Sequence, residues 1–226
     1  MHIDLSGRTA LVTTGSTQGI GLAIATGLAA AGARVGVNGR SRDRVDAAIV
    51  EILAQVPSAE LVPVVADVTD EAGAESVVGQ LGRVDVLVNN LGIFGAAEPL
   101  EISDDEWRRY FDVNVLSAVR LTRLLMPAMI ENGWGRILVI SSDSSIVTPA
   151  EMIHYGVSKT ALLGVTRGFA KAAAGTGVTV NSVLAGPTHT GASKTSSTSS
   201  WTRHSPGRRP SASSCACTAR SPCCSA

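Results

Sequence analysis

Two side chains four residues apart, Tyr155 and Lys159, could carry out proton transfer in this chain. They lie at the start of a predicted helix, where positions i and i+4 share a face and place the ammonium group beside the phenol. A free tyrosine has a pKa of about 10, and a nearby cation favours the phenolate and so lowers that pKa. The spacing therefore predicts that Tyr155 is a general acid or base near neutral pH. A chance surface pair would show the same spacing, so the assignment depends on what accompanies it.

A glycine-rich segment from Thr14 to Gly21 has the residues of a phosphate-binding turn. Gly15 allows a tight turn, Gly19 lets the backbone approach a phosphate, and Gly21 lets the following helix pack closely on the strand. The N-terminal amides and the positive dipole end of that helix favour a pyrophosphate. An ordinary strand-to-helix turn is the alternative, but the strand before it and the helix after it favour dinucleotide binding.

Two further polar residues are candidates for the same site. Ser142 follows the fifth predicted strand, and ligands of open α/β sheets bind beyond the carboxyl ends of the strands. A serine there can hydrogen-bond a substrate carbonyl, although Ser144 and Ser145 also allow a plain serine-rich loop. Asn114 lies between two valines inside a long predicted helix, where a satisfied buried amide or a helix bend is the alternative to a catalytic role.

The elements that must position these residues alternate along the chain. Short apolar runs predict strands at 9–13, 34–38, 61–66, 84–89, 136–141 and 178–183. Helices are predicted near 19–31, 42–55, 70–81, 103–126 and 152–174. Ser103 and Glu106 form a capping box, and Pro127 is expected to end or kink the helix it follows. This alternation predicts the α/β class, with a doubly wound parallel sheet.

Composition narrows the class of protein. The chain has 226 residues, 45% hydrophobic and 17% charged, with no net charge, which excludes a fibrous or wholly disordered chain. The uncharged stretch 9–33 is long enough for a membrane helix, but its glycines fit a strand, a turn and a buried helix better. The start lacks the features of a signal peptide, and residues 1–187 have no cysteine, so we expect a cytoplasmic protein without a membrane segment.

The last residues differ from the rest. Residues 188–226 carry five basic side chains, no acidic ones and all four cysteines. We expect 191–226 to be a disordered, low-complexity tail after a domain at 1–190. The abrupt change indicates translation out of the original frame, with a genuine divergent tail as the alternative. The cysteines lack zinc-ribbon spacing, so no metal site is predicted, and a nucleic-acid-binding arm is disfavoured.

Together these motifs resemble the short-chain dehydrogenase/reductase family, over about residues 5–190. The resemblance also rests on Asp67, on Asn89 to Gly92, and on the thirteen-residue spacing from Ser142 to Tyr155. It implies a Rossmann fold with strand order 3-2-1-4-5-6 and NAD(P)(H)-dependent oxidoreduction of a small carbonyl or alcohol substrate. It also implies four catalytic residues. Tyr155 exchanges the proton, Lys159 lowers its pKa and holds the ribose, Ser142 positions the carbonyl and Asn114 holds a water.

The same resemblance implies a set of cofactor-binding residues besides Tyr155 and Lys159. These are Gly15, Ser16, Thr17, Gly19, Ile20, Gly21, Arg40, Ser41, Asp67, Val68, Asn89, Gly92, Gly186, Thr188 and Thr190. NADP(H) is favoured over NAD(H), because no acidic residue ends the second strand to bind the ribose hydroxyls. Arg40 could instead pair with a 2′-phosphate, assisted by Ser41; the alternative is that Arg40 only leads into the next helix.

The sequence departs from the family pattern in its last part. Leu91 replaces an alanine, and Ala185 replaces a proline before Gly186. The family continues with a substrate-covering segment and a seventh strand, and we expect that final strand to be missing here. A catalytically impaired nucleotide-binding remnant is therefore the alternative to an active carbonyl reductase. The helices at 103–126 and 152–174 are expected to form a homodimer interface, because they keep apolar residues beyond one stripe.

Overall fold

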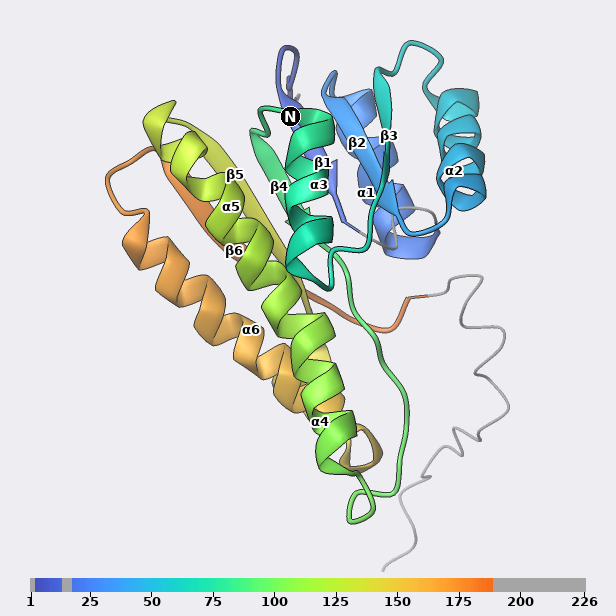
Figure 1. Cartoon of the computed structure of the whole chain (residues 1–226), viewed down its shortest axis with the longest axis vertical. Helices are drawn as coiled ribbons and strands as arrows, with labels where there is room; N and C mark the ends of the chain where they lie inside the picture. The colour runs from blue at the N-terminus through green and yellow to red at the C-terminus, as the bar shows by residue number, and fades with distance from the viewer. Residues whose placement is uncertain (1–2, 14–17, 189–226) are drawn as a thin grey trace, which may run out of the picture.

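The computed structural model describes residues 3–13 and 18–188, and they form one α/β layer structure (Figure 1). Six parallel strands form the sheet in the order β3-β2-β1-β4-β5-β6. The strands are β1 (Thr9–Val12), β2 (Arg34–Gly39), β3 (Leu61–Val65), β4 (Val86–Asn89), β5 (Gly135–Ser142) and β6 (Val178–Ala185). The predicted fold class and strand order are confirmed.

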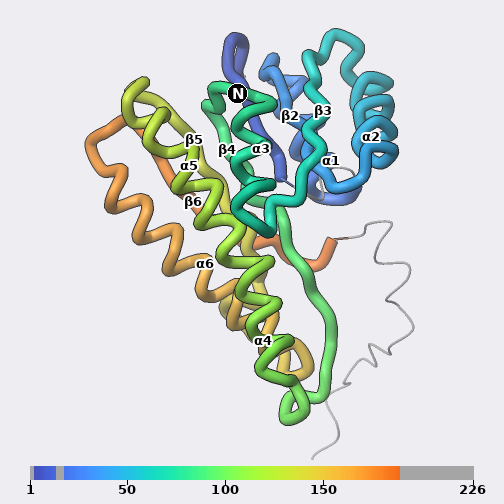
Figure 2. The backbone as a smooth tube through the Cα atoms, viewed as in Figure 1, coloured from blue at the N-terminus to red at the C-terminus, as the bar shows by residue number. Residues whose placement is uncertain are grey.

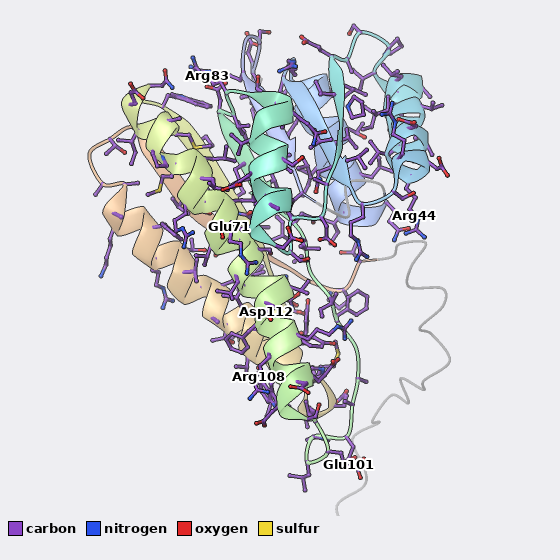
Figure 3. The ribbon with its side chains drawn as sticks, in the orientation of Figure 1. Arg44, Glu71, Arg83, Glu101, Arg108 and Asp112 are labelled. Carbon is purple, nitrogen blue, oxygen red and sulfur yellow. The ribbon has the colours of Figure 1, made fainter. Side chains whose placement is uncertain are left out.

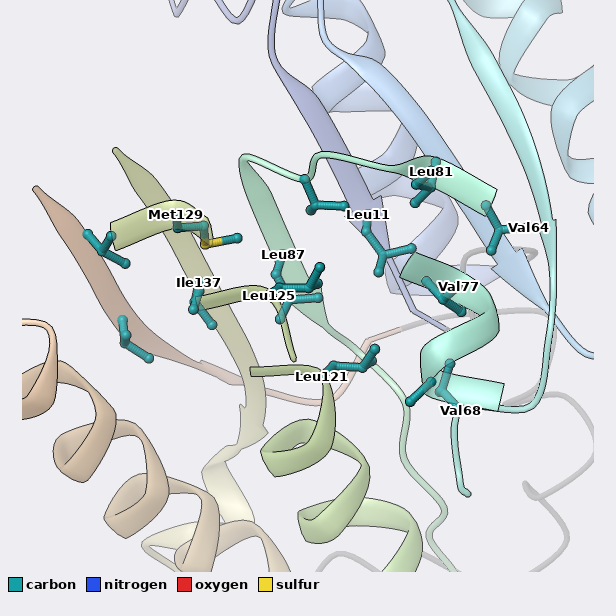
Figure 4. Packing of buried hydrophobic residues seen from close by; sticks show 14 of the residues in the cluster. Leu11, Val64, Val68, Val77, Leu81, Leu87, Leu121, Leu125, Met129 and Ile137 are labelled. Carbon is teal, nitrogen blue, oxygen red and sulfur yellow. The ribbon is translucent and has the colours of Figure 1, made fainter. Parts of the chain in front are cut away.

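Helices cover both faces of this sheet, as the chain trace in Figure 2 shows. The helices are α1 (Gly19–Ala30), α2 (Arg42–Gln55), α3 (Glu71–Leu81), α4 (Asp104–Phe111), α5 (Ser117–Glu131) and α6 (Ile153–Ala172). One core lies between the sheet and α3, α5 and α6, and includes Leu87, Leu121 and Met129 (Figure 4). A second core lies under α1 and α2, where Ala25 and Ile52 are fully buried. The crossover helices that join parallel strands cover the sheet, which explains why most of the strands are apolar.

The long helical stretch of residues 104–131 is not one regular helix. A π-helical turn, Asp112–Leu116, separates α4 from α5. Ser103 caps α4 by accepting a hydrogen bond from the Glu106 amide at 3.2 Å, which confirms half of the predicted capping box. The Glu106 carboxylate is turned instead to Arg109, at 2.9 Å. By length and composition, Asp104–Glu131 as a whole is apolar enough to cross a membrane. Buried core helices of soluble proteins can have the same length and composition.

Pro127 does not end the helix, which was one of the two outcomes predicted for it; a kink there stays a prediction. Pro127 lies inside α5, which continues to Glu131. A proline removes one backbone hydrogen bond from a helix. The residues beyond it offset that loss, because Met129 is fully buried in the core against β5.

At the far edge of the sheet, β6 pairs with β5 along eight residue positions. Within the described ranges, both helices on the α1 face pack on β1, β2 and β3. Val183 and Leu184, near the end of β6, are 44% and 43% exposed. The predicted tail at 191–226 lies outside the described residues.

Candidate functional site

The carboxyl ends of β1, β4 and β5 meet where the strand order changes direction, between β1 and β4. Crossovers from these two strands leave to opposite faces, which opens a crevice for ligands in sheets of this kind. Ser142 ends β5, Asn89 ends β4, and Tyr155 and Lys159 lie in the first turns of α6. The topology therefore brings together residues that are up to 70 positions apart in the sequence.

Lys159 is buried beside this crevice. Its Nζ donates a hydrogen bond to the Ile140 carbonyl at 2.8 Å and lies 5.8 Å from the centre of the Tyr155 ring. Burial lowers the pKa of Lys159 to about 8, because desolvation penalises the ammonium. The predicted juxtaposition with Tyr155 is present, and the ammonium is still the main form at pH 7.

Tyr155 is half-buried, and the edge of the Phe94 ring lies against it at 6.3 Å. Burial raises its pKa, a hydrogen bond with Ser142 lowers it, and the charge of Asp143 raises it, so that the net shift is upward. The expected lowering by Lys159 was wrong for the protein alone: the phenol is itself desolvated, and the Lys159 ammonium is directed at Ile140. A protonated phenol at neutral pH is suited to donate a proton.

Ser142 is buried, and its hydroxyl lies in a short network. It donates to Asp143 Oδ1 at 3.0 Å and accepts from the Ser144 amide at 3.2 Å. These bonds fix the serine at the start of a 3₁₀ turn, Asp143–Ser145. Ser142 is therefore a positioned hydroxyl next to the Tyr155 phenol, as the sequence predicted, with a carboxylate that the sequence analysis did not single out.

Asn114 is 1% exposed and lies in the π-helical turn. Its amide binds both backbone groups of Ile93: Oδ1 accepts from the nitrogen at 2.7 Å and Nδ2 donates to the oxygen at 3.0 Å. Nδ2 also donates to Ser158 Oγ at 2.9 Å. Both alternatives considered for Asn114, a satisfied amide and an irregular helix, are present together. The residue ties the segment after β4 to the start of α6.

The start of α1 is an uncapped helix N-terminus in the part that the structure describes. Gly19 has a φ of 60°, a conformation that a glycine adopts without strain. Gly21 is buried against the sheet and Ile20 is half-buried. Gln18 provides no side-chain cap, so the first amides of α1 have no partner from it. The predicted residues Gly15, Ser16, Thr17 and Thr190 lie outside the described residues.

The residues after β2 and β3 meet at the surface. Arg40 is 69% exposed, and its Nη1 lies 3.7 Å from Asp67 Oδ2. Asp67 Oδ1 accepts two hydrogen bonds from Thr69, and Ser41 is exposed at the start of α2. The side chain of Val68, another predicted cofactor-binding residue, is fully buried in the core. Only its backbone could contact a cofactor.

Asn89 and Gly92 line the crevice at the end of β4. Asn89 is buried and donates to Thr122, yet its Oδ1 has no hydrogen-bond partner among the described residues. Such an oxygen costs free energy unless a ligand group donates to it. At Gly92, a Cβ atom would lie 3.1 Å from Lys159 Nζ, so a larger residue would crowd the ammonium. These observations fit a hydroxyl-bearing nucleotide held close to the backbone.

The matching family profile is described as short chain dehydrogenase and covers residues 8–201. The chain belongs to this family.

Relatives and solved structures agree. The Bacillus subtilis protein named uncharacterized oxidoreductase YvaG is 47% identical over 190 residues, which is 84% of this chain and 72% of the relative. A putative NAD(P)-dependent gluconate 5-dehydrogenase from Beutenbergia cavernae, with bound NADP, is 41% identical with a TM-score of 0.76, covering 82% of this chain and 74% of that one. L-Sorbose reductase from Gluconobacter frateurii, in complex with NADPH and L-sorbose, is 31% identical with a TM-score of 0.76, covering 81% and 71%. The chain is thus an NAD(P)-dependent oxidoreductase of the short-chain dehydrogenase family.

Beyond β6, the dehydrogenase leaves Gly186 and Thr188 exposed near the crevice. The Thr188 hydroxyl donates to the Gly186 carbonyl at 3.0 Å, within its own turn. Asp143 Oδ2 lies 4.0 Å from the position of a Cβ atom on Gly186. The turn after β6 therefore borders the Ser142 side of the site.

Two polar residues of this dehydrogenase, Thr13 and Asn38, also bond at the carboxyl ends of the strands and were not predicted. The Thr13 hydroxyl donates to the Val88 carbonyl at 3.3 Å and accepts from the amides of Asn90 and Leu91 at 2.9 and 3.2 Å. Asn38, at the end of β2, donates to the carbonyls of Val64 and Ala66 at 3.0 and 3.1 Å. Each is a polar residue at the carboxyl end of an apolar strand, and that position was the available signal.

A pocket of about 420 Å³ adjoins the site. It is lined by residues 92–97, α4 and His154. His154 is buried against the Tyr110 ring at 4.0 Å, and its Nδ1 has no partner within the described ranges. Burial lowers the pKa of His154, although Glu106 opposes this, so the imidazole is neutral at pH 7. Phe94 lines this pocket and also contacts the Tyr155 ring, so the pocket lies next to Tyr155. The pocket could hold the part of a substrate that does not react.

Proposed function

We propose that this chain is an NADP(H)-dependent oxidoreductase that interconverts a small carbonyl compound and its alcohol, with Tyr155 as general acid and base. The observation that carries the proposal is the convergence of Ser142, Tyr155 and Lys159 at the carboxyl ends of the strands, beside the nucleotide crevice. The bound nicotinamide would supply or accept the hydride.

The protein's own groups handle the proton. In reduction, the protonated Tyr155 hydroxyl donates to the substrate oxygen as negative charge develops there. The Ser142 hydroxyl, next to it, orients the carbonyl. The Lys159 ammonium favours the phenolate that results, because opposite charges attract across the 5.8 Å to the ring in a buried site. Asn114 keeps Ile93, and with it the wall of the site, in place.

Preference for NADP(H) is supported by Arg40. No acidic residue ends β2, and Arg40 is exposed where its guanidinium could bind a 2′-phosphate. Its present partner Asp67 is distant and exposed, so the pair is weak and easily exchanged. The gluconate 5-dehydrogenase relative has NADP in its structure and the sorbose reductase has NADPH, in line with this preference.

The test uses the purified full chain with 2,3-butanedione as substrate. We expect NADPH to be oxidised faster than NADH and to bind more tightly in a fluorescence titration. Arg40→Ala should weaken NADPH binding about tenfold and leave NADH binding unchanged, because one charge-assisted contact is lost. Lys171→Ala removes a distant cation and is the matched control.

Two results would contradict the proposal. Tighter binding of NADH would remove the NADP(H) assignment. Cofactor binding without turnover of any carbonyl would favour the alternative, a catalytically impaired nucleotide-binding remnant. A cytoplasmic location stays a prediction.

We also propose that the chain forms a homodimer through α4, α5 and α6. Leu116 is 40% exposed, and Val157 is also exposed, which leaves apolar surface on these helices. Leu121 and Leu162 of the same helices are buried within the subunit and cannot contribute. Sedimentation at micromolar concentration tests the assembly; a monomer or a tetramer would contradict it.

A further inference from the structure

Asp143 follows Ser142 directly and is held in a fixed position. Its Oδ1 accepts the Ser142 hydroxyl at 3.0 Å. Its backbone carbonyl accepts from the amides of Ile146 and Val147 at 2.9 and 3.0 Å. The side chain and the main chain are therefore both anchored, although the residue is exposed to solvent.

The second carboxylate oxygen faces the turn after the neighbouring strand. Oδ2 lies 4.0 Å from the position that a Cβ atom on Gly186 would occupy. The carboxylate thus lies between the ends of β5 and β6, at the border of the crevice that holds Ser142 and Tyr155. No lysine or arginine in the described part of the chain forms an ion pair with it. Lys159, the cation of the site, donates to Ile140 instead.

We propose that Asp143 is a specificity-determining residue, which selects carbonyl substrates with a neutral hydrogen-bond donor, such as a hydroxyl or amide, over substrates with a carboxylate on the carbon beside the reacting carbonyl. The inference rests on the proposed function and adds the chemical class of its substrate.

Two physical effects support this selection. An ionised carboxylate only accepts hydrogen bonds, so Oδ2 favours a hydroxyl or an amide of the substrate. A substrate carboxylate at the same place would meet an unneutralised like charge, which Coulomb repulsion opposes even at partial exposure. The charge of Asp143 already acts at the reacting group, because it raises the pKa of Tyr155 after burial, while Ser142 lowers it.

A matched pair of substrates tests the proposal. Acetoacetamide and acetoacetate have the same heavy-atom skeleton and differ in the charge of one terminal group. We expect the wild type to reduce acetoacetamide with about a tenfold higher kcat/KM than acetoacetate. Asp143→Asn keeps an acceptor for Ser142 and removes the charge, and should bring the ratio close to one.

The ratio of the two substrates cancels any effect of the variant on cofactor binding. Glu131→Gln removes the same charge at the end of α5, shortly before the start of β5 and so at the other end of that strand from Asp143, and should keep the wild-type ratio. An unchanged ratio in Asp143→Asn would overturn the inference while leaving the proposed function intact. Failure of every carbonyl probe, 2,3-butanedione included, would overturn both.

A readout without turnover comes from the two tyrosines of the chain. In a Tyr110→Phe background, the ultraviolet absorbance of tyrosinate reports Tyr155 alone. Its titration should move to lower pH when Asp143→Asn is added, because Asp143 no longer disfavours the phenolate. Lys159 and Asp143 are the charged groups around Tyr155. The two samples, Tyr110→Phe with and without Asp143→Asn, differ only at residue 143. An unmoved titration would show that this carboxylate does not act at the reacting phenol.

Discussion

Buried polar groups at the two ends of the strands differ in how many have hydrogen-bond or ion-pair partners. Arg83, at the end where the strands begin, lies far from Glu101 at the other extreme of the molecule (Figure 3). At the beginning of the strands, each buried charge has partners. At the carboxyl ends, two buried polar atoms lack partners among the described residues, and one buried ammonium is desolvated. The first arrangement favours stability, whereas the second leaves groups available for ligands.

Asp85 organises the amino end. Arg8 and Arg83 contact its carboxylate at 3.3 and 2.6 Å, and the Thr9 amide donates to it at 3.0 Å. Burial opposes ionisation, but these hydrogen bonds and the charge of Arg83 outweigh it, so the pKa of Asp85 is lowered. Arg8 also lies over the Trp134 ring, with Cζ 4.0 Å from its centre. This cluster joins β1, β4 and β5 at their start.

The carboxyl end carries groups that cost free energy. Asn89 Oδ1 and His154 Nδ1 are buried without partners among the described residues, and Lys159 is a desolvated ammonium. Each would be a defect in a purely structural core. Their concentration around Tyr155 indicates that this end was selected for chemistry. Substitutions at the two ends should therefore separate activity from stability.

The largest effect is expected for Tyr155→Phe. Losing the hydroxyl removes the proton donor, and kcat/KM should fall roughly 100- to 10,000-fold. NADPH affinity and the thermal midpoint should stay close to wild type. Steady-state reduction, fluorescence titration and calorimetry measure the three quantities. Tyr110→Phe, the other tyrosine, should lose far less activity; equal losses would contradict the assignment.

Asp85→Ala should act on stability instead. It removes the partner of two arginines and of the Thr9 amide, and we expect a loss of about 2–4 kcal/mol in the free energy of unfolding. The turnover of the folded fraction should not change. Urea unfolding at neutral pH measures the loss.

The pH dependence of this difference has a definite sign. Because the folded pKa of Asp85 is lowered, its contribution is present above the unfolded value of about 3.9 and is lost as the pH falls through the folded value. The gap between wild type and Asp85→Ala should close in acid. A gap that persists there would mean that the carboxylate charge is not what stabilises the strands.

Lys159→Met should stabilise the fold, whereas Asp85→Ala destabilises it, and the expected effect is smaller. The folded pKa of about 8 lies below the value of 10.5 for free lysine, so folding disfavours the ammonium. The variant should gain up to about 3 kcal/mol at pH 7, while its activity falls. The gain should shrink as the pH rises from about 8 to 10.5, where the unfolded lysine also loses its proton. Chemical unfolding at several pH values measures it, and a destabilised variant would contradict the inference.

The regular elements were predictable because their signal is local. The periodicity placed a helix at 42–55, as observed in α2, and each predicted strand overlaps an observed one. The sequence also correctly predicted Ser103 as the N-terminal cap of α4. The helix does not end at Pro127, because the burial of Met129, a tertiary contact, offsets a local preference.

The site was only partly predictable for the same reason. Spacing alone placed Tyr155 beside Lys159, but the direction of the Tyr155 pKa depends on burial, which one sequence does not show. The burial of the Val68 side chain, which limits any cofactor contact of this residue to its backbone, likewise had no signal in the sequence. Asp143 was not predicted as a site residue, because the serine-rich sequence around it gives no sign that its carboxylate accepts a hydrogen bond from Ser142. Contacts between distant segments, such as Asn114 with Ile93, had no local signal.

The π-helical turn at Asp112–Leu116 makes the number of residues in this segment matter as much as their identity. A π turn holds one residue more than the α-helical turn it replaces, and each residue rotates a helix by about 100°. Deleting a single codon there would restore a regular helix and rotate α4 relative to α5. Trp107 and Tyr110 would then leave His154, which they contact at 6.3 and 4.0 Å. Substitutions in Asp112–Leu116 should therefore be tolerated better than the deletion of one residue.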